Sequence, residues 1–334
     1  MKNPRRVVII DYRRFVPISE AFERLGYRVI SSSDDVTDQE LECCELALYC
    51  MFISIKRPWH SWRRRRLLNR AGVPVITWNR DGPSHKGEKA WRLWLLRHIE
   101  YFDIEATHAL QDLQGFAPTV TYLPNAAWDT HYNLGGASLE SLRDAGRYQV
   151  DVSFFGRINA GKYPEMKKRE SFFRELGLRL GALGISYEFR ETSMTFEEQR
   201  KFIQSSRINL SFHAGCDDNY QGGPRPDRET SWGMPERCFG IPACGGFLLS
   251  DHRKHAMDDF SPGKDWIEFS DLDDCVNKIR YYLANFDSSR QVAEAAYHRI
   301  MQHHTYVHRA QSLISAASAW REKIAADGGP GSLP

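Results

Sequence analysis

The stretch SWGMPERCFGIPACGGFLLSD, residues 231–251, organises the chain, because it combines a loop, a short helix and a buried strand. Pro235 suits the first position of a helix, and Gly245 with Gly246 supplies a left-handed stop. Residues 247–249 (Phe-Leu-Leu) are a short apolar run, typical of an interior parallel strand. A helix that opens after a loop rich in glycine and proline presents free N–H groups, which favours a phosphate site. The alternative is an ordinary helix–turn–strand connection without a binding role.

The length and charge of the chain restrict the classes of protein it can belong to. Its 334 residues exceed one core of average size, which predicts two domains. The 45 Lys and Arg nearly balance the 43 Asp and Glu, which disfavours nucleic acid or a membrane as the main partner. The seven cysteines form no C-x-x-C pair, and no signal-peptide or membrane-spanning apolar run occurs. We therefore expect a cytoplasmic protein, with peripheral membrane contact left open.

The first half alternates apolar strands with helical or long connecting segments, which predicts a parallel sheet wrapped by helices. The predicted strands are residues 7–10, 27–30, 46–53 and 73–77, with a helix at 17–25. Ligands collect beyond the carboxyl ends of such strands. Asp11, after the first strand, and Asp81, after the fourth, are therefore candidate catalytic carboxylates. The other interpretation of each is a cap for the next helix.

Residues 59–66 (Trp-His-Ser-Trp-Arg-Arg-Arg-Arg) are the most charged run in the chain. A solvated helix face is the common meaning of such a run. The alternative is a surface for an anionic acceptor, such as a phosphorylated lipid head group or a polymer. Arginine beside tryptophan also suits nucleic acid, but the balanced total charge makes that partner unfavoured.

A second α/β unit follows residues 133–147, whose polar, glycine-containing composition is typical of a domain boundary. Strands are predicted at 150–155, 186–190, 208–212 and 266–269, and helices at 167–177, 196–205, 272–285, 288–302 and 307–325. We expect an N-terminal domain at 1–145, a C-terminal domain at 146–306, a helix at 307–326 and a disordered tail at 327–334. The long loop at 213–233 favours a binding role.

Two cations follow the first strand of this second unit. Gly156 and Arg157 end the strand, and Lys162 comes shortly after, next to a further glycine. Two cations in one turn can hold a diphosphate, with backbone N–H groups completing the contacts, although such residues taken alone are more often surface charges. The complete P-loop motif and the G-x-G-x-x-G motif are absent, which disfavours a dinucleotide cofactor. His304 and His308 have no nearby third ligand, so we interpret them as surface or packing residues.

Residues 237–249 (RCFGIPACGGFLL) resemble the R-x-F-E-x-x-A-C-G segment of the spore-maturation CgeB-like glycosyltransferases, which belong with the glycosyl transferases group 1. Further segments that resemble the family are YLPN at 122–125, DVSFFG at 151–156, FSPGKDWIEF at 260–269, HTYVHR at 304–309 and a looser W-x-x-D-x-P element at 78–83. The likeness covers most of residues 101–312 and is weaker in the first half.

The resemblance implies a GT-B architecture, in which two Rossmann-like α/β domains face each other across a cleft and a C-terminal helix returns to the N-terminal domain. It also implies a glycosyltransferase that uses a UDP- or GDP-linked sugar as substrate. We expect no required metal and no other cofactor. The donor-binding residues that it implies are Gly156, Arg157, Lys162, His213, Pro235, Glu236, Arg237, Phe239 and Gly240. By position, Arg157 and Lys162 would contact the donor diphosphate, and the Arg237 segment would lie by the sugar and ribose.

Gly240 departs from the family pattern, in which a glutamate at this position accepts hydrogen bonds from donor hydroxyls. Glu236 is the candidate substitute. An inverting reaction needs a general base near the acceptor hydroxyl, with Asp11 and Asp81 as candidates, whereas a retaining one can use the leaving diphosphate. The alternatives to transfer are a non-catalytic nucleotide-sugar-binding relative and a sugar-nucleotide epimerase. The acceptor stays open among an anionic glycan, a lipid, a protein, a small metabolite and a modified nucleobase.

Overall fold

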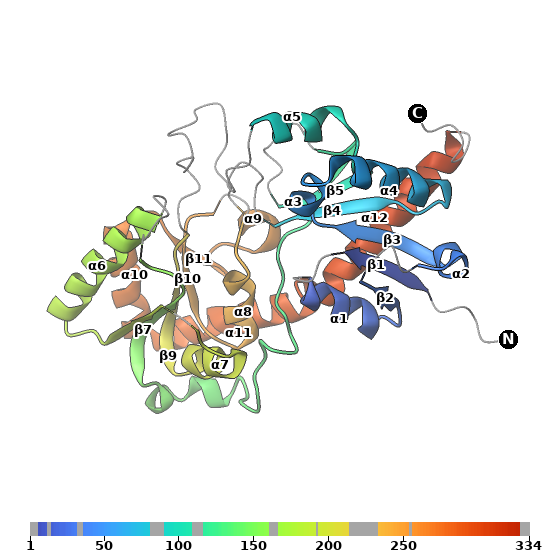
Figure 1. The fold of residues 1–334 in the computed structure, drawn as a ribbon. Coiled ribbons are helices and arrows are strands. Elements are labelled where there is room, and N and C mark those ends of the chain that lie inside the picture. The colour runs from blue at the N-terminus through green and yellow to red at the C-terminus, as the bar shows by residue number, and fades with distance from the viewer. Residues whose placement is uncertain are drawn as a thin grey trace. The chain divides into compact units, whose positions relative to one another are not determined.

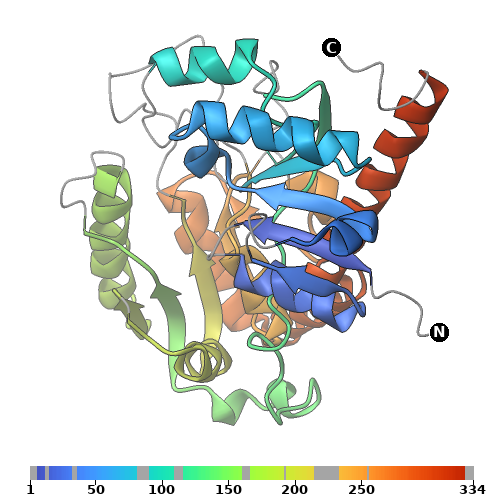
Figure 2. The same ribbon diagram turned by 45° about the vertical axis from the view of Figure 1, so that its right-hand side comes forward.

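The computed structural model describes residues 6–11, 15–31, 36–80, 90–108, 116–159, 166–191, 193–213, 233–253 and 256–327. The chain divides into two compact units, one made of residues 1–124 with 306–334 and the other of residues 125–305. Each unit contains a parallel sheet flanked by helices (Figures 1 and 2). The predicted fold class, two α/β units with parallel sheets, is confirmed.

The sheet of the first unit has the strand order β2-β1-β3-β4-β5-β6, and every pairing is parallel. Its strands are β1 (Val7–Asp11), β2 (Arg28–Ile30), β3 (Cys44–Tyr49), β4 (Val75–Asn79), β5 (Ile104–Thr107) and β6 (Thr119–Tyr122). Its helices are α1 (Val16–Arg24), α2 (Asp38–Glu42), α3 (Met51–Ser54), α4 (Pro58–Arg70), α5 (Ala90–His98) and α12 (Tyr306–Ala326).

Two helical layers cover this sheet. On one side α1 packs against α12, and α12 also contacts β3. The other side is covered by α4 and α5, because Leu68 and Leu96 join one buried cluster with Val7, Ile9 and Val75 of the strands. Both crossovers, from β3 to β4 and from β4 to β5, advance the sheet in the same direction. Right-handed connections then put their helices on the same face.

The last helix is fixed to the first unit at both of its ends. At its start the Tyr306 ring lies edge-on to Trp78, with 5.9 Å between centroids, and its hydroxyl accepts a hydrogen bond from Arg80 at 3.1 Å. Near its end Arg321 donates to the backbone oxygen of Glu45 at 2.9 Å. These contacts confirm that the C-terminal helix returns to the N-terminal unit.

Two details differ from the sequence expectations, and a third is not described. The strand expected at 46–53 stops at Tyr49, and residues 51–54 instead form the short helix α3. The units divide after Pro124 rather than near residue 145, because Asn125 donates to the Met234 oxygen and the Ala127 amide to the His304 oxygen, each at 2.8 Å. The tail expected at 327–334 lies outside the described residues beyond position 327.

The sheet of the second unit has the order β11-β10-β9-β7-β8 and is also parallel. Its strands are β7 (Val150–Phe155), β8 (Tyr187–Arg190), β9 (Ser206–Ser211), β10 (Leu248–Asp251) and β11 (Ile267–Phe269). Its helices are α6 (Met166–Ala182), α7 (Phe196–Gln204), α8 (Arg237–Ala243), α9 (Ala256–Asp259), α10 (Leu272–Ala284) and α11 (Phe286–His303). No helix in the described part of the chain is long and apolar enough to cross a membrane.

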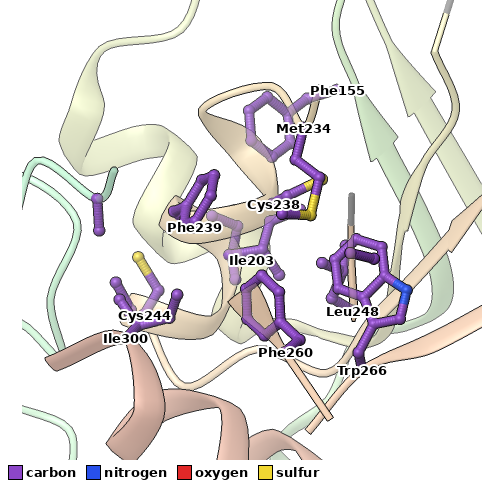
Figure 3. Close-up of a cluster of buried hydrophobic side chains, with 14 of the residues drawn as sticks. Phe155, Ile203, Met234, Cys238, Phe239, Cys244, Leu248, Phe260, Trp266 and Ile300 are labelled. Atoms are coloured by element: carbon purple, nitrogen blue, oxygen red, sulfur yellow. The ribbon is translucent and has the colours of Figure 1, made fainter. Parts of the chain in front are cut away.

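Alternate residues of these strands supply two separate cores. One cluster places Val152, Phe154 and Leu249 against α6 and α10. The other places Phe155 and Leu248 against α7, α8 and α11, as Figure 3 shows around Phe239 and Cys238. The two-residue repeat of a strand explains this division, since successive side chains point to opposite faces of the sheet.

Helix α8 is almost wholly enclosed by this second core. All of its residues except Arg237 are buried. It begins at Arg237, two residues later than the expected start at Pro235, and ends at Ala243. Gly245 then adopts φ = +73°, which is the left-handed stop that the sequence predicted.

Gly240 of α8 lies directly against an aromatic ring. A β-carbon at this position would come within 3.1 Å of Cγ of Tyr132. The Tyr132 hydroxyl is held by a 2.6 Å hydrogen bond to Gln199, so the ring cannot easily move aside. The ring therefore occupies the space into which a side chain at position 240 would extend.

We predict that Gly240→Glu lowers the free energy of unfolding by about 3 kcal/mol or more, because it forces a carboxylate into a filled, buried position. Urea unfolding of the purified variant measures this change. Adding Tyr132→Ala to the same chain should recover part of the loss. The matched control is Gly181→Glu in α6, where nothing lies within 4 Å of the added carbon. An equal effect of both glutamates would contradict the packing explanation.

Candidate anion-binding site

Three neighbouring strands of the second unit end at the same edge of their sheet. Strand β7 leads to Gly156, β9 to His213, and β10 ends at Asp251. Helix α8 begins with Arg237, whose side chain lies beside the end of β7. The carboxyl edge of a parallel sheet is where such folds place their ligands. These four residues therefore define the candidate site.

The guanidinium of Arg237 is packed over aromatic rings and a glycine. Its carbon lies 4.9 Å from the ring centroid of Phe154 and 5.9 Å from that of Phe155. A β-carbon on Gly156 would come within 2.7 Å of Nη2, and Gly156 has φ = +139°. The backbone therefore requires glycine at position 156, and an added β-carbon would displace the guanidinium.

One donor of this guanidinium is buried and unused. Nη1 of Arg237 is covered and has no hydrogen-bond partner within the described residues. Burial lowers the pKa of Arg237, while Cys238 and Asp251 act in the opposite direction. A guanidinium nevertheless stays protonated in proteins. A buried cation with an unsatisfied donor is costly, and a bound anion would remove that cost.

Beside Arg237, His213 and Asp251 form a hydrogen-bonded pair. Nδ1 of His213 lies 2.6 Å from Oδ1 of Asp251, and the His213 backbone N–H donates to Oδ2 at 3.1 Å. Arg253 donates to the same Oδ2 at 3.0 Å. Both oxygens of the Asp251 carboxylate thus accept hydrogen bonds from neighbouring residues.

The protonation states follow from this geometry. Burial lowers the pKa of His213 to about 4, with Arg253 acting in the same direction and Asp251 against it. Burial alone would raise the pKa of Asp251, but His213 and Arg253 outweigh it and hold the value at about 2. At neutral pH the imidazole is therefore neutral and the carboxylate ionised.

The neutral imidazole must carry its proton on Nδ1, because that nitrogen faces an ionised carboxylate. Nε2 is then a hydrogen-bond acceptor, and it is buried without a partner among the described residues. The edge of the sheet thus offers a cationic donor at Arg237 and a neutral acceptor at His213. This combination suits a ligand that carries both an anionic group and a hydroxyl.

The remaining predicted donor residues fall in different surroundings. Pro235 and Glu236 precede α8 and are half-buried, and Arg157 is exposed. Phe239 is fully buried, 5.8 Å from the Phe260 ring and 5.7 Å from that of His304, so its side chain packs in the core rather than at the edge. His304 belongs to the same core, which agrees with a packing role.

The expected catalytic carboxylates are described only in part. Asp11 ends β1 in the first unit and is half-buried. Asp81 and the predicted donor residue Lys162 lie outside the described residues. Within the described ranges, no group of three or more His, Cys, Asp or Glu could hold a metal ion.

The sequence interpretation missed Asp251, Arg253 and Tyr132. Asp251 carried a usable signal, because a polar residue that ends a buried parallel strand lies at the ligand-binding edge. The roles of Arg253 and Tyr132 depend on contacts that no local pattern encodes.

A solvent-open cavity of about 650 Å³ lies next to Asp251. Phe172 and Phe212 line it, with their rings stacked 4.2 Å apart, together with Lys167 and Lys168 of α6. This cavity is on the α6 and α10 side of the sheet, whereas Arg237 begins α8, which packs against the opposite core. The two features are therefore distinct parts of one sheet edge.

We predict that His213 makes the stability of the chain depend on pH between about 6.5 and 4. Its folded pKa of about 4 is below the ordinary value of 6.5, so the unfolded chain binds the proton first as the pH falls. The contribution of His213 to the free energy of unfolding is complete above pH 6.5. It is lost toward pH 4, by up to about 1.4 kcal/mol per pH unit. Urea unfolding at a series of pH values should show this loss in the natural chain and not in His213→Asn. Parallel pH curves for the two chains would exclude the role given to His213.

Comparison with solved structures gives the fold of the whole chain. Sucrose-phosphate synthase from Thermosynechococcus elongatus matches with a TM-score of 0.60 and 11% identity, covering 96% of this chain and 100% of that one. HepE of Anabaena in complex with UDP-glucose matches with a TM-score of 0.53 and 11% identity, over 94% and 100% of the two chains. A glycosyltransferase from Rickettsia africae matches with a TM-score of 0.58 and 10% identity, over 95% and 99%.

These similarities establish a GT-B fold with two Rossmann-like units. No curated protein sequence matches the chain. The glycosyl transferase-like family model matches residues 139–315, which is more than half of the chain and includes Arg237, His213 and Asp251. The chain therefore belongs to the glycosyl transferase-like family.

Proposed function

We propose that this protein transfers a sugar from a nucleoside-diphosphate donor, and that Arg237 binds the donor diphosphate. The observation that carries the proposal is the buried Nη1 of Arg237, which has no partner in the described part of the chain. A diphosphate supplies both the negative charge and the acceptor oxygens that this group lacks. Hydrogen bonds between a guanidinium and a phosphate are among the strongest in proteins.

The same contact would assist the reaction. When the glycosidic bond to the donor breaks, negative charge grows on the departing diphosphate. A cation already fixed at that position stabilises the transition state without reorganising. Gly156 contributes by having no side chain, because this lets an anion approach the guanidinium and the end of β7 closely.

The segment after β7 supports a phosphate site that works without a metal. Residues 156–162 (GRINAGK) have the glycine and lysine spacing of a phosphate-binding loop. Tyr163 follows where that motif has the Ser or Thr that holds Mg²⁺. We therefore propose that Arg237, Arg157 and Lys162 compensate the diphosphate charge in place of a metal ion.

Recognition of the donor hydroxyls would fall to His213 and Glu236. Nε2 of His213 is a buried acceptor beside the cation. Glu236 directly precedes Arg237 and is half-buried, which makes it the candidate carboxylate where Gly240 provides none. If the reaction inverts the sugar, Asp11 or Asp81 of the first unit would activate the acceptor hydroxyl as general base.

A second candidate function is nucleotide-sugar binding without transfer. It is favoured by one observation, the Tyr132 ring that fills the space beside Gly240. Incubation with UDP-glucose and other common nucleotide sugars distinguishes the two functions. Release of the nucleoside diphosphate, by hydrolysis or by transfer to an added acceptor, supports the enzyme. Binding without turnover of any donor supports the second candidate.

We predict that UDP or GDP raises the melting temperature in the presence of EDTA, and that Arg237→Met abolishes the rise. At a ligand concentration one hundred times Kd, binding stabilises a protein by about 2.7 kcal/mol. The unliganded variant should be at least as stable as the natural chain, because it no longer buries an unpaired cation. Arg174→Met on the exposed face of α6 is the matched control and should keep the shift. A full shift in Arg237→Met would refute the assignment.

We predict that Gly156→Ala also abolishes nucleotide binding, since its β-carbon would come within 2.7 Å of Nη2 of Arg237. Backbone strain at a positive φ costs about 1 kcal/mol in addition. Gly184→Ala is the control for a positive φ in open space, although its φ of +67° is less strained than the +139° of Gly156. Calorimetric titration with UDP should detect binding to the Gly184 variant alone. Loss of binding in both variants would mean that strain, not displacement of the guanidinium, is responsible.

A further inference from the structure

Helices α4 and α5 present their outer sides next to each other. Leu68 of α4 and Leu96 of α5 point into the same core cluster, so both helices cover one face of the first sheet. Both views of the fold show α5 adjacent to α4 (Figures 1 and 2). The outward residues of α3, α4 and α5 therefore form one surface, which we call the tryptophan–arginine face. It contains Ile53, Trp59, Arg63, Arg66, Leu67, Arg70, Trp91, Trp94 and Arg97.

One arginine of the charged run has a structural role and fixes how the others point. Arg65 is buried and donates to Oδ1 of Asp103 at 2.9 Å, and Asn69 donates to the same atom at 3.0 Å. These bonds hold one side of α4 against the sheet. Arg63, Arg66 and Arg70 are consequently directed to solvent and are exposed.

Large apolar side chains are exposed among these arginines. Trp59 is 74% exposed, and Trp91 and Trp94 are 54% and 56% exposed. Leu67 at 55% and Ile53 at 45% accompany them. Tryptophan is usually well buried, and single exposed apolar residues need no explanation, but a group on one face marks an interaction surface.

The charged residues that make up this face are all arginines, and the exposed Glu100 beside it is paired with Arg65 at 2.9 Å. Residues 51–80 contain eight Lys or Arg and residues 90–99 contain two, and neither segment contains Asp or Glu. The exposed Arg63, Arg70 and Arg97 form no ion pair with any residue that the structure describes. A surface of uncompensated cations fits an anionic partner.

The aliphatic residues and the covered rings decide between two anionic partners. Nucleic acid needs free aromatic faces for base stacking. Here the Trp94 ring already stacks on His98 at 4.3 Å, and Arg92 lies over Trp91 at 5.3 Å. Leu67 and Ile53 would have no partner on a phosphate backbone. In a bilayer, tryptophan and aliphatic groups enter the head-group boundary while arginines meet lipid phosphates.

We propose that the tryptophan–arginine face docks the protein on the surface of an anionic phospholipid bilayer. This goes beyond the proposed sugar transfer, because it concerns the first unit and needs no nucleotide. The contact is peripheral: tryptophans and aliphatic side chains lie at head-group depth, and the arginines neutralise lipid phosphates. Binding depends on anionic lipid and weakens as salt rises.

The test uses sedimentation of the full chain with vesicles of phosphatidylcholine, with and without phosphatidylglycerol. We expect binding to the anionic vesicles only. Arg63→Glu with Arg70→Glu should weaken it at least about tenfold, since each basic residue adds to the attraction. Trp59→Ala should weaken it by a smaller factor and reduce quenching of tryptophan fluorescence by brominated lipid. The matched control, Arg174→Glu with Arg280→Glu, makes the same charge change on exposed residues of the second unit.

The outcomes separate this proposal from its rivals. Equal weakening by both charge-reversed pairs would overturn it, because net charge alone would then explain binding. Binding to a DNA oligonucleotide but not to vesicles would also overturn it in favour of nucleic acid. The melting temperatures of the same variants without nucleotide verify that each is folded, and nucleotide-induced shifts report on the donor site independently.

Discussion

The position of the Arg237 guanidinium against Phe154 and Gly156, with its Nη1 covered, is the constraint on which the candidate site depends. Helix α8 cannot shift or rotate without exposing buried side chains, because every residue after Arg237 is enclosed by the core. This placement leaves the side chain at position 237 directed at the end of β7. An apolar residue there would fold at lower cost, since burying an unpaired cation is unfavourable. Stability alone therefore does not explain the arginine, whereas the proposed contact with a diphosphate would.

The neighbouring acidic group leaves Nη1 of this cation without a hydrogen-bond partner among the described residues. Asp251 accepts from both His213 N–H groups and from Arg253, and these bonds hold its pKa at about 2. Its carboxylate therefore interacts with groups at the ends of β9 and β10. The consequence is an edge with a positive donor at Arg237 and a neutral acceptor on His213. An edge with a free carboxylate would instead repel a diphosphate.

Gly240 and Tyr132 show how a departure from a family pattern is accommodated by packing. A glycine in a helix usually costs about 1 kcal/mol relative to alanine. Here it allows the Tyr132 ring to lie against α8, with its hydroxyl held by Gln199. Burial and the nearby Glu236 raise the pKa of Tyr132, so the ring stays neutral. Any recognition of donor hydroxyls must therefore come from residues around the ring, which is the physical reason to consider Glu236 and His213.

The features that could be predicted from the sequence are those whose cause is local. Alternating apolar segments predicted the parallel sheets, and Thr195 with Glu198 forms the N-terminal cap that places α7. The glycine and lysine spacing at 156–162 is also local, and it departs from the P-loop motif at Tyr163. Contacts between distant segments were beyond such patterns. Asp103 orients the arginines of α4 from a strand end far along the chain, and Tyr132 reaches α8 from before β7. A run of four arginines therefore does not by itself predict a binding surface. The buried arginine determines which of the others face solvent, and the sequence does not identify it.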